Sequence, residues 1–404
     1  MFEVSHCDVC GAKLSDRTLL GEFPIADDLS KTRQEAMGRE LFPIAISLCD
    51  NCLTINQLIR LENHVLFADN YHYRANLTAD VVNGMNSLLQ EVDSILPLRN
   101  KSILDVGTND GSLLDLALQY EPSVTIGVEP TNAIQDNKCD EHIKYKDYFT
   151  DTLAEQIIKQ AGTLDVIVFT NVFAHIDPFS ELMRAVLSAM TDETLLVIEN
   201  HYLGSVLQNH QFDTFYHEHP RTYSLTSFKE IAARFNLHLE HASFPERYGG
   251  NIRVFMRKSG GGKKISREIQ SQLEREQATL ESQYRQLLKS ISDWRDDITE
   301  KLSSLQSQSL PYFFRTLPAR SSILLGLIPE HLVRGVPVCE KLGSKKIGLF
   351  VPRTGNEIVD VDNCPLVHDP NATCVNLSWH ISQEIRADMQ SRGFAGKFLD
   401  ILSG

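Results

Sequence analysis

The stretch Lys101-Ser102-Ile103-Leu104-Asp105-Val106-Gly107-Thr108-Asn109-Asp110-Gly111-Ser112 decides the fold that we expect for this chain. It begins with an apolar run typical of a buried strand, breaks at Gly107 and continues into an apolar helical segment from Leu113 onward. This order predicts the first strand, turn and helix of a doubly wound α/β sheet. Gly107 and Gly111 let the backbone approach a ligand closely. Asp105 and Asp110 place carboxylates beside that ligand, which favours a cation over a pyrophosphate.

Further strands follow at the spacing of such a sheet. A second strand at 124–128 precedes Glu129, about twenty residues past the turn, where a carboxylate can bind both ribose hydroxyls. Tyr148 and Phe149 offer an edge and a stacking ring for adenine. Two more apolar runs, 164–171 and 194–200, supply later strands. Together these pieces fit a methyltransferase that uses S-adenosylmethionine, whose sulfonium is cationic.

Two cysteine pairs near the N-terminus predict a metal site. Cys7 and Cys10 form one CxxC pair, and Cys49 and Cys52 form the other. Four thiolates can close a tetrahedron around Zn²⁺ at a Zn–S distance of about 2.3 Å. We therefore expect structural zinc, with the long segment between the pairs forming a hairpin.

A short segment holds an unusual density of proton-handling groups. Residues 211–224 read Gln-Phe-Asp-Thr-Phe-Tyr-His-Glu-His-Pro-Arg-Thr-Tyr-Ser, and this block indicates a reaction centre. The alternative is a polar loop whose side chains only form hydrogen bonds and have no chemical role. Upstream, Tyr71 and Tyr73 lie in an aromatic and basic patch, which is either a packing surface or a lid that delivers a tyrosine hydroxyl.

Composition limits the classes of function. The 404 residues are 42% apolar and carry a formal net charge of −14, which makes nucleic-acid binding unlikely as the main role because phosphate contacts need clustered Lys and Arg. No run of about twenty apolar residues and no signal-peptide pattern occurs. We expect a cytoplasmic protein without a membrane partner, acting as a monomer or weak dimer.

These motifs, taken in order, resemble the sugar C-methyltransferases that act on nucleotide-linked keto-deoxysugars, such as those of mycarose, noviose and tetronitrose biosynthesis. The resemblance runs over most of the chain. It is carried by the cysteine pairs, the Tyr71–Tyr73 segment and the residues at 107–111, 171–175, 199–202, 216–219 and 249–254. The Tyr-His-Glu-His block at 216–219 is its most specific element.

The resemblance implies an α/β fold: a Rossmann-like class I methyltransferase core with an N-terminal zinc-binding lobe and a C-terminal α/β lobe. We expect the zinc lobe at 1–70, the methyltransferase domain at 71–258, and a helical linker with the substrate lobe at 259–404. The charged, glycine-free stretch from 263 to about 308 has helical periodicity and predicts one or two long amphipathic helices.

The resemblance also implies roles for individual residues. His219 would be the base that removes a proton beside a ketone, and Glu218 would orient it or contact the sugar. Tyr216, His175 and one of the tyrosines at 71 and 73 would donate hydrogen bonds to the enolate oxygen. The cofactor would be bound by Asp105, Gly107, Asn109, Asp110, Gly111, Glu129, Tyr148, Phe149 and Asn171. The sugar would be bound by Asn200, His201, Arg221, Tyr223 and Arg320.

The chain departs from the family at one turn of the third lobe. Where the family has a glycine-rich turn with a lysine, residues 317–322 read Leu-Pro-Ala-Arg-Ser-Ser, with Arg320 in the lysine's place. Arginine keeps the charge but changes a point donor into a planar fork.

Two other functions stay open. One is an O- or N-methyltransferase that acts on a sugar or small metabolite, because the same base could remove a proton from a hydroxyl or ammonium group. The other is a catalytically idle zinc- and S-adenosylmethionine-binding partner protein.

Overall fold

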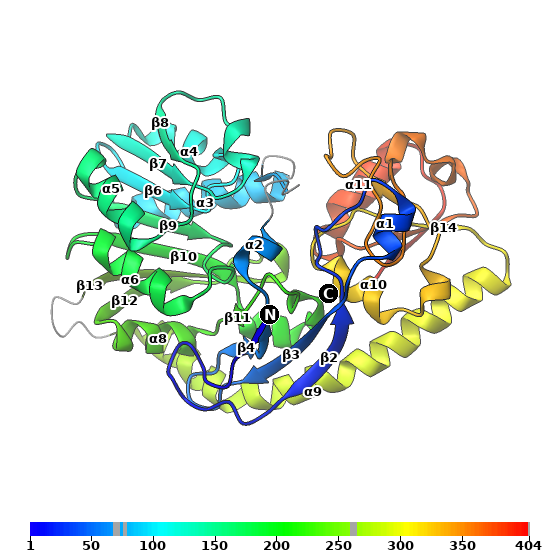
Figure 1. Cartoon of the computed structure of the whole chain (residues 1–404), viewed down its shortest axis with the longest axis horizontal. Coiled ribbons are helices and arrows are strands. Elements are labelled where there is room, and N and C mark those ends of the chain that lie inside the picture. The colour runs from blue at the N-terminus through cyan, green and yellow to red at the C-terminus, as the bar shows by residue number, and fades with distance from the viewer. Residues whose placement is uncertain (68–72, 76–78, 259–264, 403–404) are drawn as a thin grey trace. The chain divides into compact units, whose positions relative to one another are not determined.

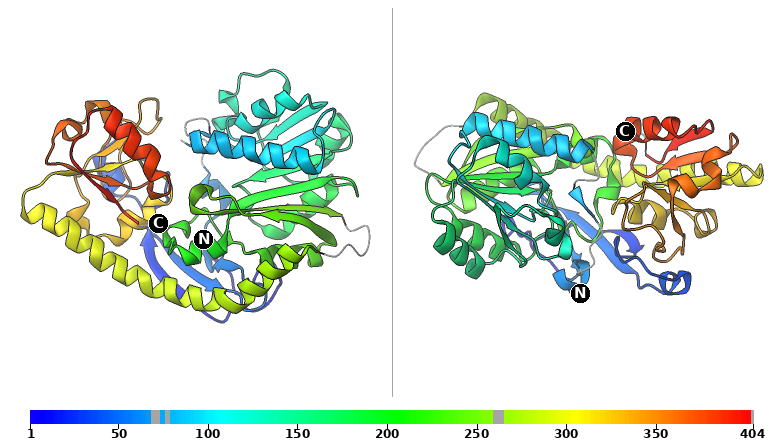
Figure 2. Two further views of the ribbon diagram at one scale, coloured as in Figure 1. Left: turned by 180° about the vertical axis from the view of Figure 1, so that it is seen from behind. Right: turned by 90° about the horizontal axis from the view of Figure 1, so that it is seen from above.

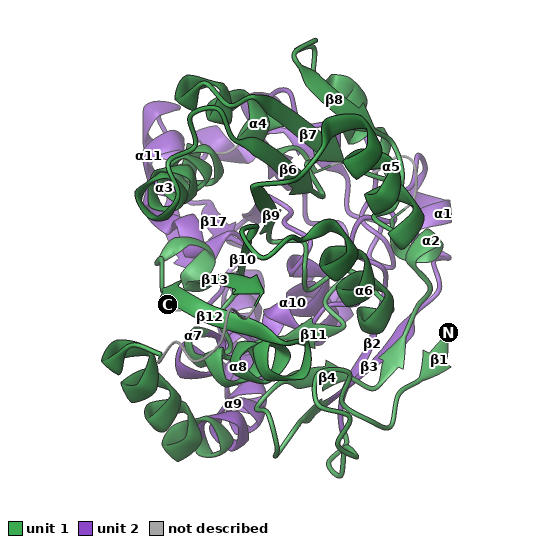
Figure 3. Cartoon of the chain, turned by 90° about the vertical axis from the view of Figure 1, so that its left-hand side faces the viewer, with its two compact units in different colours: residues 1–17, 47–205, 218–282 green, residues 18–46, 206–217, 283–404 purple. Residues whose placement is uncertain are grey.

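The structure is a computed structural model that describes residues 1–67, 73–75, 79–258 and 265–402. These residues fall into two compact units, coloured separately in Figure 3. The first comprises residues 1–17, 47–205 and 218–282, and the second comprises residues 18–46, 206–217 and 283–404. The division does not follow the three predicted domain ranges, which stay a prediction.

The first unit is built on a seven-stranded sheet in the order β12-β13-β10-β9-β6-β7-β8 (Figure 1). The strands from β10 to β8 are parallel, and β13 is antiparallel to both β10 and β12. Their bounds are β6 Ser102–Val106, β7 Val124–Val128, β8 His142–Tyr145, β9 Val166–Thr170, β10 Leu195–His201, β12 Leu237–Ser243 and β13 Asn251–Lys258.

Helices cover both faces of this sheet. Because side chains alternate along a strand, Ile103 faces a core with α3 and α4, and Leu104 faces another core with α5, α6 and α8. Figure 2 shows α3 along its face of the sheet. The helices are α2 Asn63–Leu66, α3 Ala79–Ile95, α4 Ser112–Ala117, α5 Asp151–Ala161, α6 Phe179–Ala189 and α8 Leu225–Arg234. Buried runs on both faces are what a parallel sheet requires, so the apolar runs of the sequence predicted it.

Local signals fix where these helices begin and end. The Thr150 hydroxyl accepts the Leu153 N–H at the start of α5, and Gly162, at φ 80°, ends it. Ser224 and Ser227 bond reciprocally in a capping box at the start of α8. Two short antiparallel pairs complete the first unit: β1 Phe2–Glu3 with β5 Ile59–Arg60, and β4 Ile55–Gln57 with β11 Arg221–Thr222.

The second unit contains a five-stranded parallel sheet in the order β16-β15-β14-β17-β18. Its strands are β14 Tyr312–Arg315, β15 Val338–Glu340, β16 Ile358–Asp360, β17 Thr373–Asn376 and β18 Lys397–Asp400, and its helices include α10 Ser321–Leu327 and α11 Ser382–Ser391. The order reverses between β14 and β17, as in a doubly wound sheet. This confirms the predicted C-terminal α/β lobe.

The segment between the cysteine pairs is an antiparallel hairpin of β2 Thr18–Phe23 and β3 Phe42–Leu48, with α1 Arg33–Met37 between them. The hairpin up to Ile46 belongs to the second unit, whereas the cysteines belong to the first.

The predicted amphipathic stretch is one helix, α9 Arg267–Ser307. It begins in the first unit and ends in the second, as does α7 Leu203–Gln208. Ile269 and Leu273 of α9 join the core of the first unit, and the Trp294 indole donates to the Ile401 carbonyl in the second. No helix in the described part of the chain is apolar and long enough to cross a membrane.

Candidate active site

The turn after β6 has the left-handed backbone that its glycines predict. Gly107 and Gly111 have φ of 75° and 77°. A Cβ on Gly107 would lie 2.5 Å from the Val172 side chain, and one on Gly111 would lie 2.3 Å from the Asn137 amide. The glycines are therefore already required by close packing within the protein, which is an additional reason to the predicted approach of a ligand.

Three carboxylates surround this turn, as expected for a cationic ligand. Asp105, Asp110 and Glu129 are all buried. Burial raises the pKa of Asp105 to about 7, and the charges of Glu129 and Asp110 add to this effect. Glu129 accepts the N–H groups of Asn109 at 3.1 Å and Thr131 at 2.9 Å. A bound cation would relieve the repulsion among these carboxylates, so the residues fit a sulfonium cofactor with hydroxyl groups.

The remaining predicted cofactor residues differ in accessibility. Phe149 is buried and packs edge-to-face on Phe169, with ring centroids 6.2 Å apart, so it is a core residue rather than an accessible stacking ring. Tyr148 is 40% exposed and available to a ligand. Asn171, at φ 55°, accepts the amide of Asn251 at 3.2 Å. Of the two residues predicted to contact adenine, Tyr148 is the exposed one.

Three histidines gather in the first unit and form what we call the histidine cluster: His175, His201 and His219. The His175 and His219 rings are 4.5 Å apart, and the His201 and His219 rings are 5.4 Å apart. They come from the segment after β9, the end of β10 and the segment before β11. Burial lowers the pKa of His175 to about 4, so it is neutral at pH 7. Glu218 Oε2 lies 4.0 Å from His175 Nδ1.

Asn200 directly precedes His201 on β10, and its side-chain amide is buried. The residue is 1% exposed, and neither Oδ1 nor Nδ2 has a hydrogen-bond partner among the residues that the structure describes. Buried amides are almost always paired, so the Asn200 amide is a candidate contact for a ligand. Asn200 was predicted to bind the sugar, and this observation supports that role.

A pair of tyrosines lies beside the histidine cluster. The hydroxyls of Tyr73 and Tyr248 are 3.3 Å apart. The Tyr73 carbonyl accepts the side-chain amide of Asn109 at 3.3 Å, and the Tyr248 ring contacts the His201 ring at 5.7 Å. The pair thus connects the cofactor turn to the histidines. The sequence reasoning missed Tyr248; its position before Gly249 and Gly250 was the available signal. Tyr71 lies outside the described residues.

Arg221 and Tyr223, predicted to contact the sugar, instead belong to a closed charge cluster of Asp8, Arg60, Asp177 and Arg221. Arg221 Nη1 lies 2.7 Å from both Asp8 and Asp177, and its Nε donates to the Tyr223 hydroxyl at 2.9 Å. Arg60 binds the same two carboxylates at 2.7 and 3.0 Å. The Arg221 side chain is 0% exposed. Arg221 is thus paired within the protein, and its predicted contact with the sugar stays a prediction.

Tyr216 and His217 fall in the second unit. The His217 Nε2–H donates to the Phe42 carbonyl at 3.1 Å, and burial lowers its pKa to about 4. Tyr216 is buried, and its predicted place in the cradle stays a prediction.

The four cysteines of the predicted zinc site come together. Their sulfurs all lie within 4.8 Å of one another, with Cys7–Cys52 and Cys10–Cys49 each at 3.5 Å. Each pair forms the same turn: the Gly11 N–H donates to the Cys7 carbonyl, and the Leu53 N–H donates to the Cys49 carbonyl. Contacts with Cys49 and Cys52 lower the pKa of Cys7. Four clustered cysteine sulfurs fit a divalent ion with thiolate ligands.

Arg320 lies in the second unit near the carboxyl ends of β14 and β17. Its Nε and Nη2 bind the Asp213 carboxylate at 2.8 and 2.9 Å, and its guanidinium lies 4.9 Å from the Trp379 ring centroid. Its charge is therefore paired within the protein, although Nη1 has no hydrogen-bond partner in the described ranges. The sugar contact predicted for Arg320 would have to form at Nη1.

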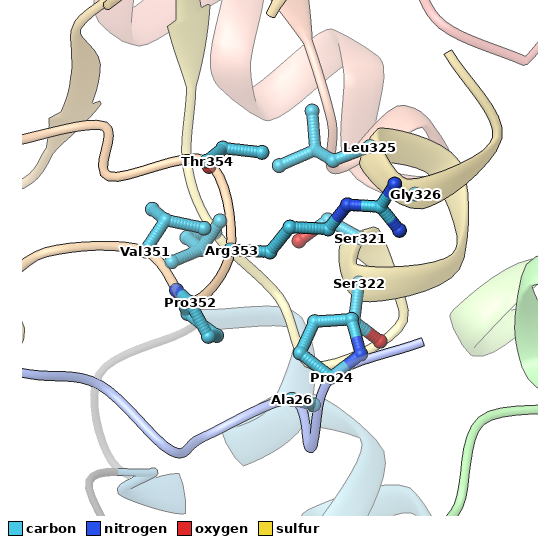
Figure 4. Close-up of a pocket in the computed structure, with 11 residues that line it drawn as sticks. Pro24, Ala26, Ser321, Ser322, Leu325, Gly326, Val351, Pro352, Arg353 and Thr354 are labelled. Carbon is cyan, nitrogen blue, oxygen red and sulfur yellow. The ribbon is translucent and has the colours of Figure 1, made fainter. Parts of the chain in front are cut away.

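The second unit also contains a small cavity beside the turn at residues 317–322 (Figure 4). Apolar walls come from Pro24, Leu325 and Val351, and the hydroxyls of Ser322 and Thr354 have no partner among the described residues. Its volume of about 20 Å³ suits roughly one water. The cavity is too small for a sugar.

Comparisons with known proteins agree with this architecture. A methyltransferase-domain model matches residues 79–242, and a C-methyltransferase C-terminal-domain model matches residues 246–401. The chain is 28% identical over 255 residues to the C-methyltransferase NovU of Streptomyces niveus, covering 62% of this chain and 60% of NovU. The match thus spans about three fifths of the relative's length.

Solved structures show weaker likeness. The plantazolicin methyltransferase BpumL has a TM-score of 0.36 and 13% identity, covering 46% of this chain and 87% of its own. YcgJ of Bacillus subtilis has a TM-score of 0.34 and 12% identity, covering 44% and 99%. The family models and NovU confirm the predicted class I methyltransferase fold and the predicted resemblance: a methyltransferase domain followed by a C-methyltransferase C-terminal domain.

Proposed function

From a chain that carries both of these domains, we propose an S-adenosylmethionine-dependent C-methyltransferase that acts on a nucleotide-linked 4-keto-deoxysugar. The observation that carries the proposal is the histidine cluster with the unpaired Asn200 amide, joined through Tyr73 and Tyr248 to the acidic turn after β6. A proton acceptor, hydrogen-bond donors and a cation-binding turn in one unit are the parts that carbon methylation needs.

The cofactor would be held by the turn and by the strand ends beside it. Asp105 and Asp110 would face the sulfonium, Glu129 would bind the ribose hydroxyls, and the exposed ring of Tyr148 would stack on adenine. When bound, S-adenosylmethionine supplies an electrophilic methyl group whose C–S bond breaks with the electron pair going to sulfur. The carboxylates attract the cationic form and repel an anionic dinucleotide.

His219 is the base of the proposed reaction. Its imidazole accepts the proton from the carbon beside the ketone, and the electrons of that C–H bond form the enolate. His175 stays neutral at pH 7 because burial lowers its pKa to about 4, so it can donate an N–H to the substrate without repelling protonated His219. In this proposal Glu218, next to His219 in the chain, would orient the base or contact the sugar, and Asn200 would offer its amide to the sugar.

We also propose that zinc bound by Cys7, Cys10, Cys49 and Cys52 is structural. Four sulfurs leave no open coordination position for a reacting group. The protein is proposed to work in the cytoplasm as a monomer or weak dimer.

The test is incubation of the purified protein with S-adenosylmethionine and a panel of nucleotide-linked 4-keto-deoxysugars, followed by mass spectrometry and NMR. We expect S-adenosylhomocysteine and a new carbon-bound methyl group. His219→Asn should lower the rate by about 10²–10⁴-fold, the usual contribution of a general base.

Two other outcomes separate the alternatives. A product with the new methyl group on oxygen or nitrogen would exclude the C-methyltransferase and support the O- or N-methyltransferase. Failure to bind the cofactor in calorimetry would sink the enzyme proposal altogether.

A further inference from the structure

We propose that Tyr248, together with Tyr73, donates a hydrogen bond to the enolate oxygen and is a further catalytic residue of this reaction. The proposal rests on the C-methyltransferase function proposed above. Tyr248 lies outside the Tyr-His-Glu-His block that points to the base, and its role comes from its geometry.

The spacing of the two hydroxyls suits a single acceptor. Two donors 3.3 Å apart can both lie within about 2.7–3.1 Å of one oxygen, the distance that stabilises a developing oxyanion. Tyr73 is 39% exposed and Tyr248 is partly exposed, so a ligand can reach both. Burial raises the pKa of each phenol above its ordinary value of 10.0, so both keep their protons at neutral pH. Two neutral donors are what an enolate oxygen requires.

The Tyr73–Tyr248 pair connects the cofactor turn after β6 to the histidine cluster. Tyr73 is bonded to Asn109 of the cofactor turn, and the Tyr248 ring contacts His201, which in turn contacts His219. An oxygen bound by both hydroxyls therefore belongs to a substrate held near the base and the cofactor.

The backbone conformation of Tyr248 and the charged side chains near it hold its ring in place. Tyr248 has φ 55° and ψ 22°, a left-handed conformation that costs a non-glycine residue about 1–3 kcal/mol and clusters at functional sites. The Arg247 guanidinium lies 4.9 Å from the Tyr248 ring centroid and 3.0 Å from the buried Glu199 carboxylate. Glu199 also accepts the Asn251 amide at 2.8 Å and pairs with Arg253. This network fixes the direction of the ring.

In the proposed step, His219 removes the α-proton, the C–H electrons form a carbon–carbon double bond, and the carbonyl π electrons move to oxygen. Tyr73 and Tyr248 donate hydrogen bonds to that oxygen without losing their protons. When the α-carbon forms its bond to the methyl group, the oxygen electrons restore the carbonyl and His219 retains the proton.

The test is exchange of the α-proton for deuterium in D₂O, followed by mass spectrometry with S-adenosylhomocysteine in place of the methyl donor. Exchange needs the enolate and no methyl transfer. We expect Tyr248→Phe to slow exchange by about 10²–10³-fold, the loss seen when one oxyanion donor is removed. Its affinity for S-adenosylhomocysteine in calorimetry and its Tm should match the wild type.

Unchanged exchange in a folded Tyr248→Phe variant would overturn the role of Tyr248 while leaving the proposed function standing. If that variant does not fold, Tyr73→Phe removes the other hydroxyl, and unchanged exchange there overturns the pair. A wild-type protein that exchanges no α-proton with any keto sugar refutes the proposed function and this inference together.

Discussion

The closed charge cluster and the histidine cluster of the first unit both consist of polar residues that look alike in the sequence. They differ in how many of their hydrogen-bonding groups have a partner within the protein. The closed charge cluster combines Arg60 and Arg221 with Asp8 and Asp177, and each cation binds both carboxylates at 2.7–3.0 Å. By contrast, the side-chain amide of Asn200, which directly precedes His201 on β10, has no hydrogen-bond partner among the described residues.

The difference separates stability from binding. A buried polar group that the protein already pairs has nothing left to offer a ligand, whereas an unpaired one requires a partner from outside. Arg221 and Asn200 were both predicted to bind the sugar, and only Asn200 retains free hydrogen-bonding capacity.

Removing the zinc site should have the largest effect, because Asp8 of the closed cluster lies between two of the cysteines. Zinc binding contributes about 10 kcal/mol in small zinc-folded peptides, so we expect Cys49→Ser to lose the metal and most of the stability. Mass spectrometry of the native protein should find one zinc in the wild type and none in the variant. Cys374→Ser, which changes a buried cysteine outside the four-sulfur site, is the control; equal zinc in both variants would contradict the assignment.

Arg221→Ala tests the closed cluster. It removes a buried cation from between the partly buried Asp8 and Asp177, and we expect the free energy of unfolding to fall by about 3 kcal/mol. Urea unfolding measures this loss. Arg99→Ala removes the exposed ion pair with Glu121 and should change stability by less than about 1 kcal/mol. A loss of binding without a loss of stability in Arg221→Ala would restore its predicted contact with the sugar.

Asn200→Ala tests the unpaired amide next to the histidine cluster in the chain. We expect KM for the sugar to rise by about 10–100-fold, corresponding to about 1–3 kcal/mol for a lost polar contact, with stability unchanged. Asn376 is the matched control, since its amide donates to Asp400 at 2.8 Å and accepts the Ser378 N–H at 3.0 Å. Asn376→Ala should lower stability and leave KM alone. The reverse pattern would break the distinction between the clusters.

The two clusters should also respond to acid at different pH, which is the smallest expected effect. Burial lowers the pKa of His175 from 6.5 to about 4, so the unfolded chain binds its proton first and stability falls as the pH drops from 6.5 to about 4. Although burial opposes it, pairing with Arg221 and Arg60 holds the pKa of Asp177 below 3.8, so its contribution is lost only below that pH. Unfolding measured against pH should show a flatter curve between 6.5 and 4 in His175→Asn.

The sequence predicted the methyltransferase sheet well because its strands are continuous apolar runs broken at glycine. The runs at 101–107 and 124–128 became β6 and β7, and the two CxxC pairs became one four-sulfur cluster. Such signals are local: they depend on spacing along the chain, which the sequence displays directly.

Pairing between distant segments was not predictable in this way. Phe149 entered the core against Phe169, Arg221 was paired by Asp8 and Asp177, and Arg320 by Asp213. Tyr248 reached Tyr73 across a long separation in sequence, and nothing but the following glycines marked it.

The sequence by itself therefore determined the kinds of parts: an α/β sheet with a glycine-containing acidic turn, a set of four cysteines that fits zinc, and a segment rich in proton-handling groups. The tertiary structure alone decided which polar residues are already paired and which are left for a ligand. The physical reason is that pairing a buried charge depends on groups that only the folded chain brings within hydrogen-bonding distance.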